Sequence, residues 1–384
     1  MNYLDVDTSE ITPAMLENIM LYFGWSKLKS FPKKADVWKS KDNTKKQWVP
    51  NIIELADYDE KIYEIINSIA ESEKLTEAEV ALQFKQLYNS RDLIQLRIVS
   101  NDVTEGNIVF GDGIKLFDSF KTLVNGAISE VSGAIKDVKD SFLNESILGQ
   151  TAVGSYIINA YLPLLNEPIK DLEQPQLKNV DGSGIGRKIN QTLINRLDIL
   201  NHVLSNYSDK HSNEQIDALL RVGYTKKECE SIESLFGKSG NRSWEIKVLW
   251  SGVLPNPRGQ NSFVRFDKSV ATNAHKITNK LKDTKLHEGV KLIGRVVGLK
   301  RDYDDKLGHV TIKTTFEKQD ITISAEMDDN CYSIADKAND SKSHVTVKGN
   351  LIKAQVGKYT KYIMPLVTSI EIAQMELGIT SIDK

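Results

Sequence analysis

Two charged residues, Glu245 and Lys247, have the spacing of metal-dependent hydrolases within the segment SWEIKVLW (residues 243–250). On a β-strand they would point to the same face, where a carboxylate holds magnesium and a lysine steadies the attacking water. Such a site also needs an acidic partner one strand earlier, but the preceding glutamates, Glu228, Glu230 and Glu233, follow a helical pattern. Alternating charges are equally typical of any half-exposed strand. A magnesium-dependent nuclease is therefore an alternative function and not the leading one.

A glycine-rich loop, DGSGIGRKIN (residues 181–190), precedes a helical pattern. Gly182 and Gly184 fit a dinucleotide-binding fingerprint, but Arg187 occupies its third glycine position, and the preceding residues are polar and unlike a strand. Backbone N–H groups together with Arg187 and Lys188 could hold a phosphate at the helix start. The context favours a linker that ends where a helix begins, with phosphate binding as the weaker interpretation.

The remaining chemical motifs are incomplete. The segment GQTAVGSY (residues 149–156) has the glycine spacing of a P-loop, but Ser155 and Tyr156 replace its lysine and its magnesium-binding hydroxyl residue. Cys229 and Cys331 lie far apart and form neither a disulfide framework nor a zinc site. The histidines show no metal-ligand spacing; they are His202, His211, His275, His287, His309 and His344. We therefore expect no catalytic constellation, no cofactor and no bound metal.

The elements that would carry these residues begin with a helix from Thr12. Residues 35–52 predict two strands around a polar turn, with Trp38 and Trp48 as a cross-strand aromatic pair. Thr76 and Glu79 have the spacing of a capping box for a later helix. A chain of 384 residues suggests two or three domains. We expect domains at 1–150, 151–286 and 287–384, the second of which could form one domain with the first.

A weak internal similarity links two parts of the chain. LIQLRIVS (93–100), GNIVFGDG (106–113) and residues 114–131 predict strand, strand and helix. SWEIKVLW, SFVRFD (262–267) and residues 270–283 repeat that order. This pattern indicates either a duplicated unit in an α/β body or coincidence, because the order is common.

The last hundred residues have the strongest architectural pattern. Strands are predicted at 290–300, 309–316, 320–327, 344–351 and 361–372, with a hairpin turn at Glu317-Lys318-Gln319 and a helix around 330–338. This order, with three strands before the helix and two after it, is that of the five-stranded OB barrel. Residues 288–374 thus resemble an OB-fold. The fold class is α+β and multi-domain, with a helix-rich α/β N-terminal body and a small C-terminal OB-like β-barrel.

The resemblance implies where a ligand would bind. OB-folds bind across the second and third strands and between the loops that follow strands one and four, where bases stack on aromatic rings and lysines follow the backbone. Asp302, Asp304 and Asp305 would oppose phosphate in the first loop, and such a barrel is equally a protein-docking module. The candidate nucleic-acid-binding residues are Lys300, Arg301, Tyr303, Lys313, Lys353, Lys358, Tyr359, Lys361 and Tyr362.

Composition and a second resemblance bound the function. The net charge of −2 argues against a general nucleic-acid coat. No signal peptide and no apolar run of about 18 residues is present, so we expect a cytoplasmic protein without a membrane partner. The whole chain loosely resembles bacterial proteins of unassigned function, some encoded near anti-phage defence genes. The leading hypothesis is a non-catalytic binding or adaptor subunit whose barrel contacts single-stranded nucleic acid or a partner protein of a larger complex. The alternatives are the nuclease and a purely protein-interacting scaffold, and the oligomeric state stays open.

Overall fold

The computed structural model describes residues 8–86, 89–103, 106–132, 136–149, 156–165, 184–251, 254, 257, 262–301 and 307–373. The chain divides into two compact units. Unit 1 contains Met1–Leu93 and Val248–Arg258, and unit 2 contains Ile94–Lys247 and Gly259–Lys384. Within the described residues, every helix is too short or too polar to cross a bilayer.

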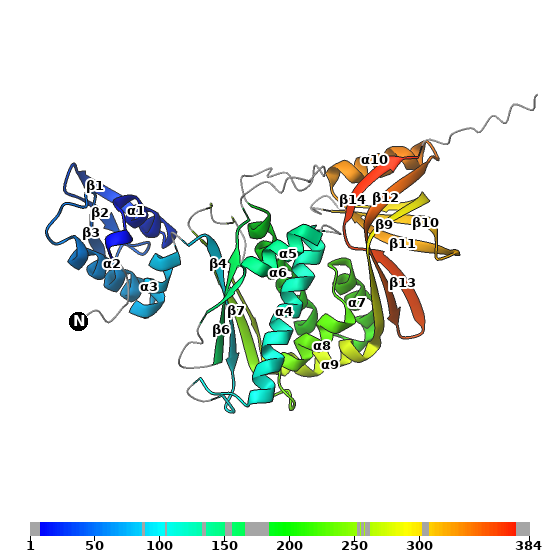
Figure 1. The fold of residues 1–384 in the computed structure, drawn as a ribbon, viewed down its shortest axis with the longest axis horizontal. Helices are drawn as coiled ribbons and strands as arrows, with labels where there is room; N and C mark the ends of the chain where they lie inside the picture. The colour runs from blue at the N-terminus through cyan, green and yellow to red at the C-terminus, as the bar shows by residue number, and fades with distance from the viewer. Residues whose placement is uncertain are drawn as a thin grey trace, which may run out of the picture. The chain divides into compact units, whose positions relative to one another are not determined.

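Unit 1 packs three helices against a small antiparallel sheet (Figure 1). The Thr12 hydroxyl accepts a hydrogen bond of 3.3 Å from the Met15 amide, which confirms the predicted start of the first helix. Thr76 and Glu79 form the predicted capping box, because the Glu79 amide donates to Thr76 Oγ1 at 3.2 Å and the Thr76 amide donates back to Glu79 Oε2 at 2.9 Å. The elements are η1 (Thr8–Glu10), α1 (Pro13–Tyr22), β1 (Ser26–Phe31), β2 (Ala35–Lys39), β3 (Lys46–Pro50), α2 (Tyr58–Glu73) and α3 (Glu77–Gln86).

The predicted cross-strand pair of Trp38 and Trp48 is wrong. The antiparallel register places Trp38 opposite Gln47 and Trp48 opposite Val37. Because side chains alternate along a strand, this one-residue offset sends the two tryptophans to opposite faces of the sheet. Trp38 is 1% exposed in the core, whereas Trp48 is 51% exposed and stacks on Phe31 with ring centroids 5.2 Å apart.

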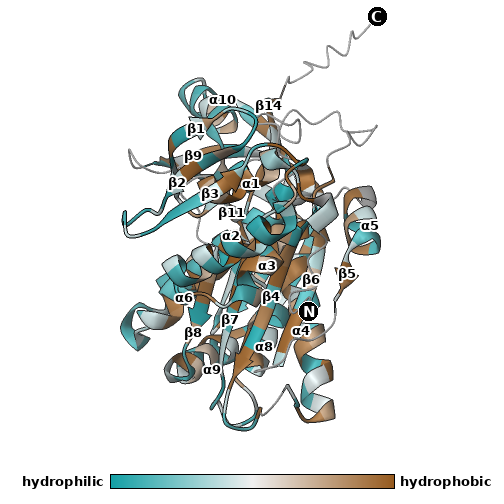
Figure 2. Ribbon diagram, turned by 90° about the vertical axis from the view of Figure 1, so that its left-hand side faces the viewer, coloured by the Kyte–Doolittle hydropathy of each residue, from teal (hydrophilic) through white to brown (hydrophobic). Residues whose placement is uncertain are grey.

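The body of unit 2 is a helical layer on a sheet whose order is β5-β6-β4-β7-β8. Helices α4, α6 and α8 lie along one face of this sheet (Figure 1), and the strands β4 and β6 carry many apolar residues, drawn in brown in Figure 2. The strands are β4 (Arg91–Val99), β5 (Ile147–Leu148), β6 (Tyr156–Pro163), β7 (Ser243–Leu249) and β8 (Phe263–Phe266); the first three residues of β4 and the last two of β7 fall within the bounds of unit 1. The helices are α4 (Phe110–Ser132), α5 (Lys136–Glu145), α6 (Ile185–Ser205), η3 (Asp209–His211), α7 (Ser212–Arg221), α8 (Lys226–Leu235), η4 (Lys268–Val270) and α9 (Ala271–Lys280).

The predicted internal similarity fails at its middle element. Residues 106–113 were expected to form a strand, but α4 already begins at Phe110. The amides of Asp112 and Gly113 both donate to the Val109 carbonyl at 2.9 Å, which starts the helical turn. Val109 and Phe110 are 66% and 84% exposed, so the apolar run that suggested a buried strand lies at the surface. In the second of the two similar segments, residues 243–283, the predicted middle strand is present as β8.

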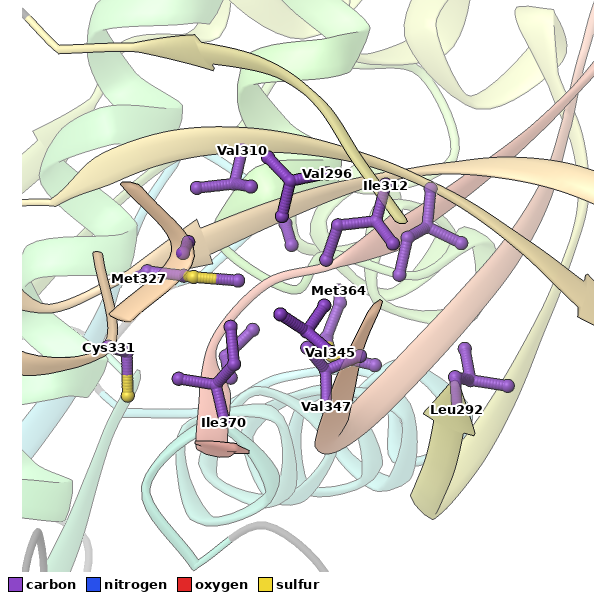
Figure 3. Close-up of a cluster of buried hydrophobic side chains, with 14 of the residues drawn as sticks. Leu292, Val296, Val310, Ile312, Met327, Cys331, Val345, Val347, Met364 and Ile370 are labelled. Atoms are coloured by element: carbon purple, nitrogen blue, oxygen red, sulfur yellow. The ribbon is translucent and has the colours of Figure 1, made fainter. Parts of the chain in front are cut away.

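The C-terminal part of unit 2 is a closed barrel with the strand order predicted for an OB-like fold. Around the barrel the order is β9-β10-β11-β13-β12, and β12 returns to β9. The β11–β13 pair is parallel, the other pairs are antiparallel, and α10 connects β11 to β12. Figure 3 shows the interior, where Val296, Ile312 and Val347 meet. The elements are β9 (Leu281–Lys300), β10 (Gly308–Phe316), β11 (Gln319–Met327), α10 (Asp329–Asp340), β12 (His344–Val356), β13 (Tyr359–Met364) and β14 (Val367–Ile372), which extends the sheet beside β12.

The predicted hairpin turn joins β10 to β11 and is strained. Glu317 and Lys318 have φ values of 49° and 64°, the left-handed conformation that a two-residue hairpin favours and that glycine adopts without cost. We expect Lys318→Gly to raise the free energy of unfolding by about 0.5–1 kcal/mol, measured by urea denaturation. The matched control is Gly357→Ala in the next hairpin. Gly357 has a φ of 59°, and a Cβ at this position would meet only open space, so this change should destabilise by a similar amount through backbone strain alone. A loss of stability in Lys318→Gly would contradict the strain argument.

Candidate nucleic-acid interface and an adjoining cavity

The face of the barrel on which OB-folds usually bind ligands is partly covered by α7. Lys361 of β13 donates to Asp217 of α7 at 2.6 Å, and Arg221 of the same helix lies 3.6 Å from Glu326 of β11. A hollow between α7 and this face is lined by residues of β10, β11 and β13, among them Thr311, Thr322 and Ser324. Lys361 is therefore neutralised by its own chain at the position where the resemblance places a phosphate contact.

The other predicted ligand residues do not form one surface. Arg301 pairs with Asp329, and Lys353 lies 3.3 Å from Glu317 and over the half-buried ring of Tyr362. Lys361 and Tyr362 are neighbours on one strand, so they point to opposite faces. Tyr303 lies outside the described residues. The predicted residues that are exposed are Lys300, Arg301, Lys313, Lys358 and Tyr359, the last being 70% exposed.

A different surface gathers basic residues on adjacent strands. Arg295 of β9 lies directly opposite Lys313 of β10 on one side and His344 of β12 on the other. Two rows further along the same face, beyond the pair of Ile293 and Thr346, Lys291 of β9 lies opposite Lys348 of β12. We call these five residues the basic face. Directly opposed residues share a face of the sheet, so like charges meet there at a cost in stability.

The basic face lies on the outside of the barrel. Leu292 and Val296 point inward, whereas Ile293 between Lys291 and Arg295 is 61% exposed. Within the described part of the chain, no ion pair neutralises Lys291, Arg295, Lys313 or Lys348. Glu371 of β14 stands at the edge, opposite Thr346.

Of the five residues of the basic face, the sequence analysis predicted only Lys313 as a binding residue. The alternation in residues 290–300 carried a signal, because Lys291 and Arg295 fall on one face of that strand. Their basic neighbours depend on the strand register, which contains an irregularity between Thr311 and Ile312. That register is not readable from the residues alone.

The residues of the nuclease hypothesis lie on β7. Glu245 and Lys247 are both half-exposed on one face of the sheet, as alternation predicts. Glu245 pairs with Arg97 of β4 at 3.2 Å and lies opposite Arg265 of β8, so its neighbours are cations. No group of three or more acidic, histidine or cysteine side chains within the described ranges is arranged to hold a metal ion. Nuclease activity stays a prediction.

The residues of the phosphate hypothesis lie at the start of α6. Gly184 is its N-cap, Arg187 is fully buried and Lys188 is exposed. A Cβ on Gly186 would lie 2.1 Å from the Pro163 carbonyl, so this glycine serves the close approach of α6 to the end of β6. Phosphate binding there stays a prediction, with Lys188 as its exposed cation.

A buried charge cluster lies between the helices. Arg196 of α6 is 3% exposed, donates to Glu228 of α8 at 2.7 Å and lies over the ring of Tyr224 at 4.5 Å. Burial is the largest single influence and works to lower the pKa of Arg196, but the charges of Glu228, Tyr224 and Glu130 and the hydrogen bond to Glu228 together outweigh it, so the pKa rises above its usual value. Gly126 of α4 makes room, because a Cβ there would lie 1.9 Å from Glu228 Oε1.

A second carboxylate, Glu130 of α4, shares the same guanidinium. Its Oε2 lies 3.2 Å from Arg196 Nε, but Nε donates its proton to the Val222 carbonyl at 3.0 Å. Glu130 Oε2 is buried and accepts no hydrogen bond from the described residues, although the side chain as a whole is 25% exposed. Burial raises the pKa of Glu130 to about 7; Glu228 adds to the rise and Arg196 opposes it.

A cavity of about 300 Å³ opens beside this cluster. Its walls come from α4, α5, the start of α8, the strands β9 and β12, and the connection between β13 and β14. Asn350 of β12 lines one wall of the cavity, and its side-chain amide donates a hydrogen bond to the Ser129 carbonyl of α4 at 3.0 Å. Asn125 of α4 also lines the cavity, and its Oδ1 is buried without a hydrogen bond from the described residues. The sequence motifs gave no indication of this cavity, because its lining residues come from six separate segments.

Comparison of the chain with protein-family models, with curated proteins and with solved structures finds no match in any of the three. The OB-like description therefore rests on the strand order and pairing of the barrel itself.

Proposed function

We propose that this chain is a non-catalytic nucleic-acid-binding protein that holds a single strand against the basic face of its barrel. The observation that carries the proposal is the direct opposition of like charges, Arg295 with Lys313 and Lys291 with Lys348, without acidic partners in the described residues. Such pairs cost stability in the free protein, and a polyanion would remove that cost.

The chemistry of the face favours the phosphate backbone over base edges. Four of its five residues are lysine or arginine, and Arg295 has the fork geometry that matches a phosphate. Exposed Ile293 adds an apolar contact between the two basic rows. The five residues of the basic face all lie on β-strands and not on a helix that could enter a duplex groove, which favours a single strand. The expected binding is tolerant of sequence and sensitive to salt.

The test is fluorescence anisotropy of labelled single-stranded DNA, single-stranded RNA and duplex DNA, titrated with the full chain at several salt concentrations. We expect the double variant Arg295→Ala/Lys313→Ala to weaken single-strand binding roughly tenfold and to reduce the salt slope by about 1–1.5, because two phosphate contacts are lost. EDTA and Glu245→Ala should leave this binding unchanged.

The matched control removes the same charge elsewhere. Lys210 in η3 and Lys268 in η4 are exposed on the helical body of unit 2. Lys210→Ala/Lys268→Ala changes the net charge as much as the test variant and should keep at least half of the affinity. Equal losses in the two double variants would show a general charge effect, and no binding by the native chain at low salt would remove the proposal.

We also propose a cellular role for the chain, which rests on the sequence resemblance alone. In this role the chain is a binding or adaptor subunit of a bacterial anti-phage system and works in the cytoplasm. Partner-protein docking is the competing outcome, and it would show as absent nucleic-acid binding together with a stable complex recovered from the native host.

A further inference from the structure

The cavity beside Arg196 contains acceptor atoms that need donors. Glu130 Oε2 and Asn125 Oδ1 are both buried, both belong to cavity-lining residues of α4, and neither receives a hydrogen bond from the described residues. Buried acceptors in folded proteins almost always have a donor. A ligand that satisfies both atoms must therefore present several N–H or O–H groups to this wall of the cavity.

The charges at the same wall favour a cation. Two carboxylates, Glu130 and Glu228, share the single guanidinium of Arg196, which leaves one negative charge uncompensated when both are ionised. An ammonium group supplies one positive charge and three N–H donors, whereas a hydroxyl supplies one donor and no charge. A cavity of about 300 Å³ has room for a molecule of roughly ten non-hydrogen atoms, taking about 30 Å³ for each.

We propose that this cavity binds the ammonium group of a small organic amine, with Glu130 as its counter-ion and Asn125 as a second acceptor. Lys139 of α5 and the exposed Lys227 of α8 also line the cavity. They favour an amine that carries an acidic group at its other end, as in an amino acid. This site is separate from the basic face and does not depend on nucleic-acid binding.

Binding should compete with a proton on Glu130. The charged and titratable groups around it are Arg196 of α6, Glu228 of α8, Tyr224 before that helix, Lys139, Lys227 and Glu288 of β9. Burial raises the pKa of Glu130 to about 7, so the carboxyl is mostly protonated below neutral pH. Amine affinity should therefore fall roughly tenfold for each pH unit below about 7 and level off above about 8.

The experiment is isothermal titration calorimetry of the full chain with n-butylamine, 4-aminobutanoate and 1-butanol. The alcohol matches n-butylamine in size without its charge. We expect both amines to bind, 1-butanol to bind at least tenfold more weakly, and 4-aminobutanoate to bind more tightly than n-butylamine if the lysines hold its carboxylate. Equal binding of n-butylamine and 1-butanol, or no amine binding at about pH 8, would overturn the proposal.

The variant Glu130→Gln keeps the volume of the side chain and removes its charge. It should weaken amine binding about tenfold to a hundredfold and abolish its pH dependence. Glu214→Gln is the control, because Glu214 of α7 is 81% exposed and lies outside the cavity lining. Amine binding that is unchanged in Glu130→Gln would refute the assignment. The pH profile of the native chain tests it independently of how that variant folds.

Discussion

Replacing Arg196 by methionine is expected to lower the free energy of unfolding by about 3–5 kcal/mol near neutral pH. The side chain is 3% exposed, and its loss leaves Glu228 buried without a counter-ion. The Val222 carbonyl would also lose its donor. Methionine preserves the apolar stem, so the effect reports the charge more than the packing. Urea denaturation followed by circular dichroism measures it.

The loss in free energy of unfolding caused by Arg196→Met should grow as the pH rises. Glu130 already has a pKa raised to about 7 from its ordinary value of 4.5. A carboxyl whose pKa is raised on folding contributes most to stability below its unfolded pKa, and this contribution is lost as the pH rises through the folded value. Without Arg196, whose charge opposes the rise, the pKa of Glu130 should rise further, so the stability of the variant should lie closest to that of the native chain near pH 5.

A double variant separates the ion pair from the rest of the site. Glu228→Gln keeps the capping box of α8, because an amide oxygen can still accept from the Thr225 amide, which Glu228 Oε2 now does at 3.0 Å. We expect Arg196→Met/Glu228→Gln to be more stable than Arg196→Met alone. If the losses in stability of the two single variants simply add up in the double variant, the carboxylate and the guanidinium do not stabilise each other.

The second large effect is expected from Gly126→Ala, which should destabilise the chain by about 2–4 kcal/mol. In an ordinary helix interior this substitution stabilises by about 1 kcal/mol, so the expected sign is reversed. The added Cβ would lie 1.9 Å from Glu228 Oε1 and 2.1 Å from an Arg196 nitrogen. The buried ion pair would have to move away from α4 to accept it.

Gly111→Ala is the matched control on the same helix. No heavy atom lies within 4 Å of a Cβ placed on Gly111. This variant should be neutral or up to about 1 kcal/mol more stable than the native chain in the same urea titration. Stabilisation by Gly126→Ala would mean that the close approach of Glu228 and Arg196 to α4 is not maintained in solution.

The barrel was largely predictable from sequence because its signals are local. The alternation in β10 and β11 and the helix between β11 and β12 each occupy a short run of residues, and together they give the OB-like order. The same local reasoning failed at Val109 and Phe110, whose apolar side chains suggested a buried strand. Solvent exposure of a short apolar run is decided by what packs on it, which is not written in the run itself.

The candidate binding surfaces could be identified only from the tertiary structure. Arg295 faces Lys313 only because of the register between β9 and β10, and Lys361 is neutralised only because α7 packs beside β13. Local patterns cannot report either contact, since both join residues far apart in the chain.

Side-chain periodicity, helix caps and turn residues therefore specify the type and order of the strands and helices. Which charges meet depends on how those elements pack. Glu130, Arg196 and Glu228 come from three helices, and only their packing places two carboxylates on one guanidinium beside a cavity. Periodicity is a pattern over a few neighbouring residues, whereas the burial and pairing of charges depend on contacts between residues far apart in the chain.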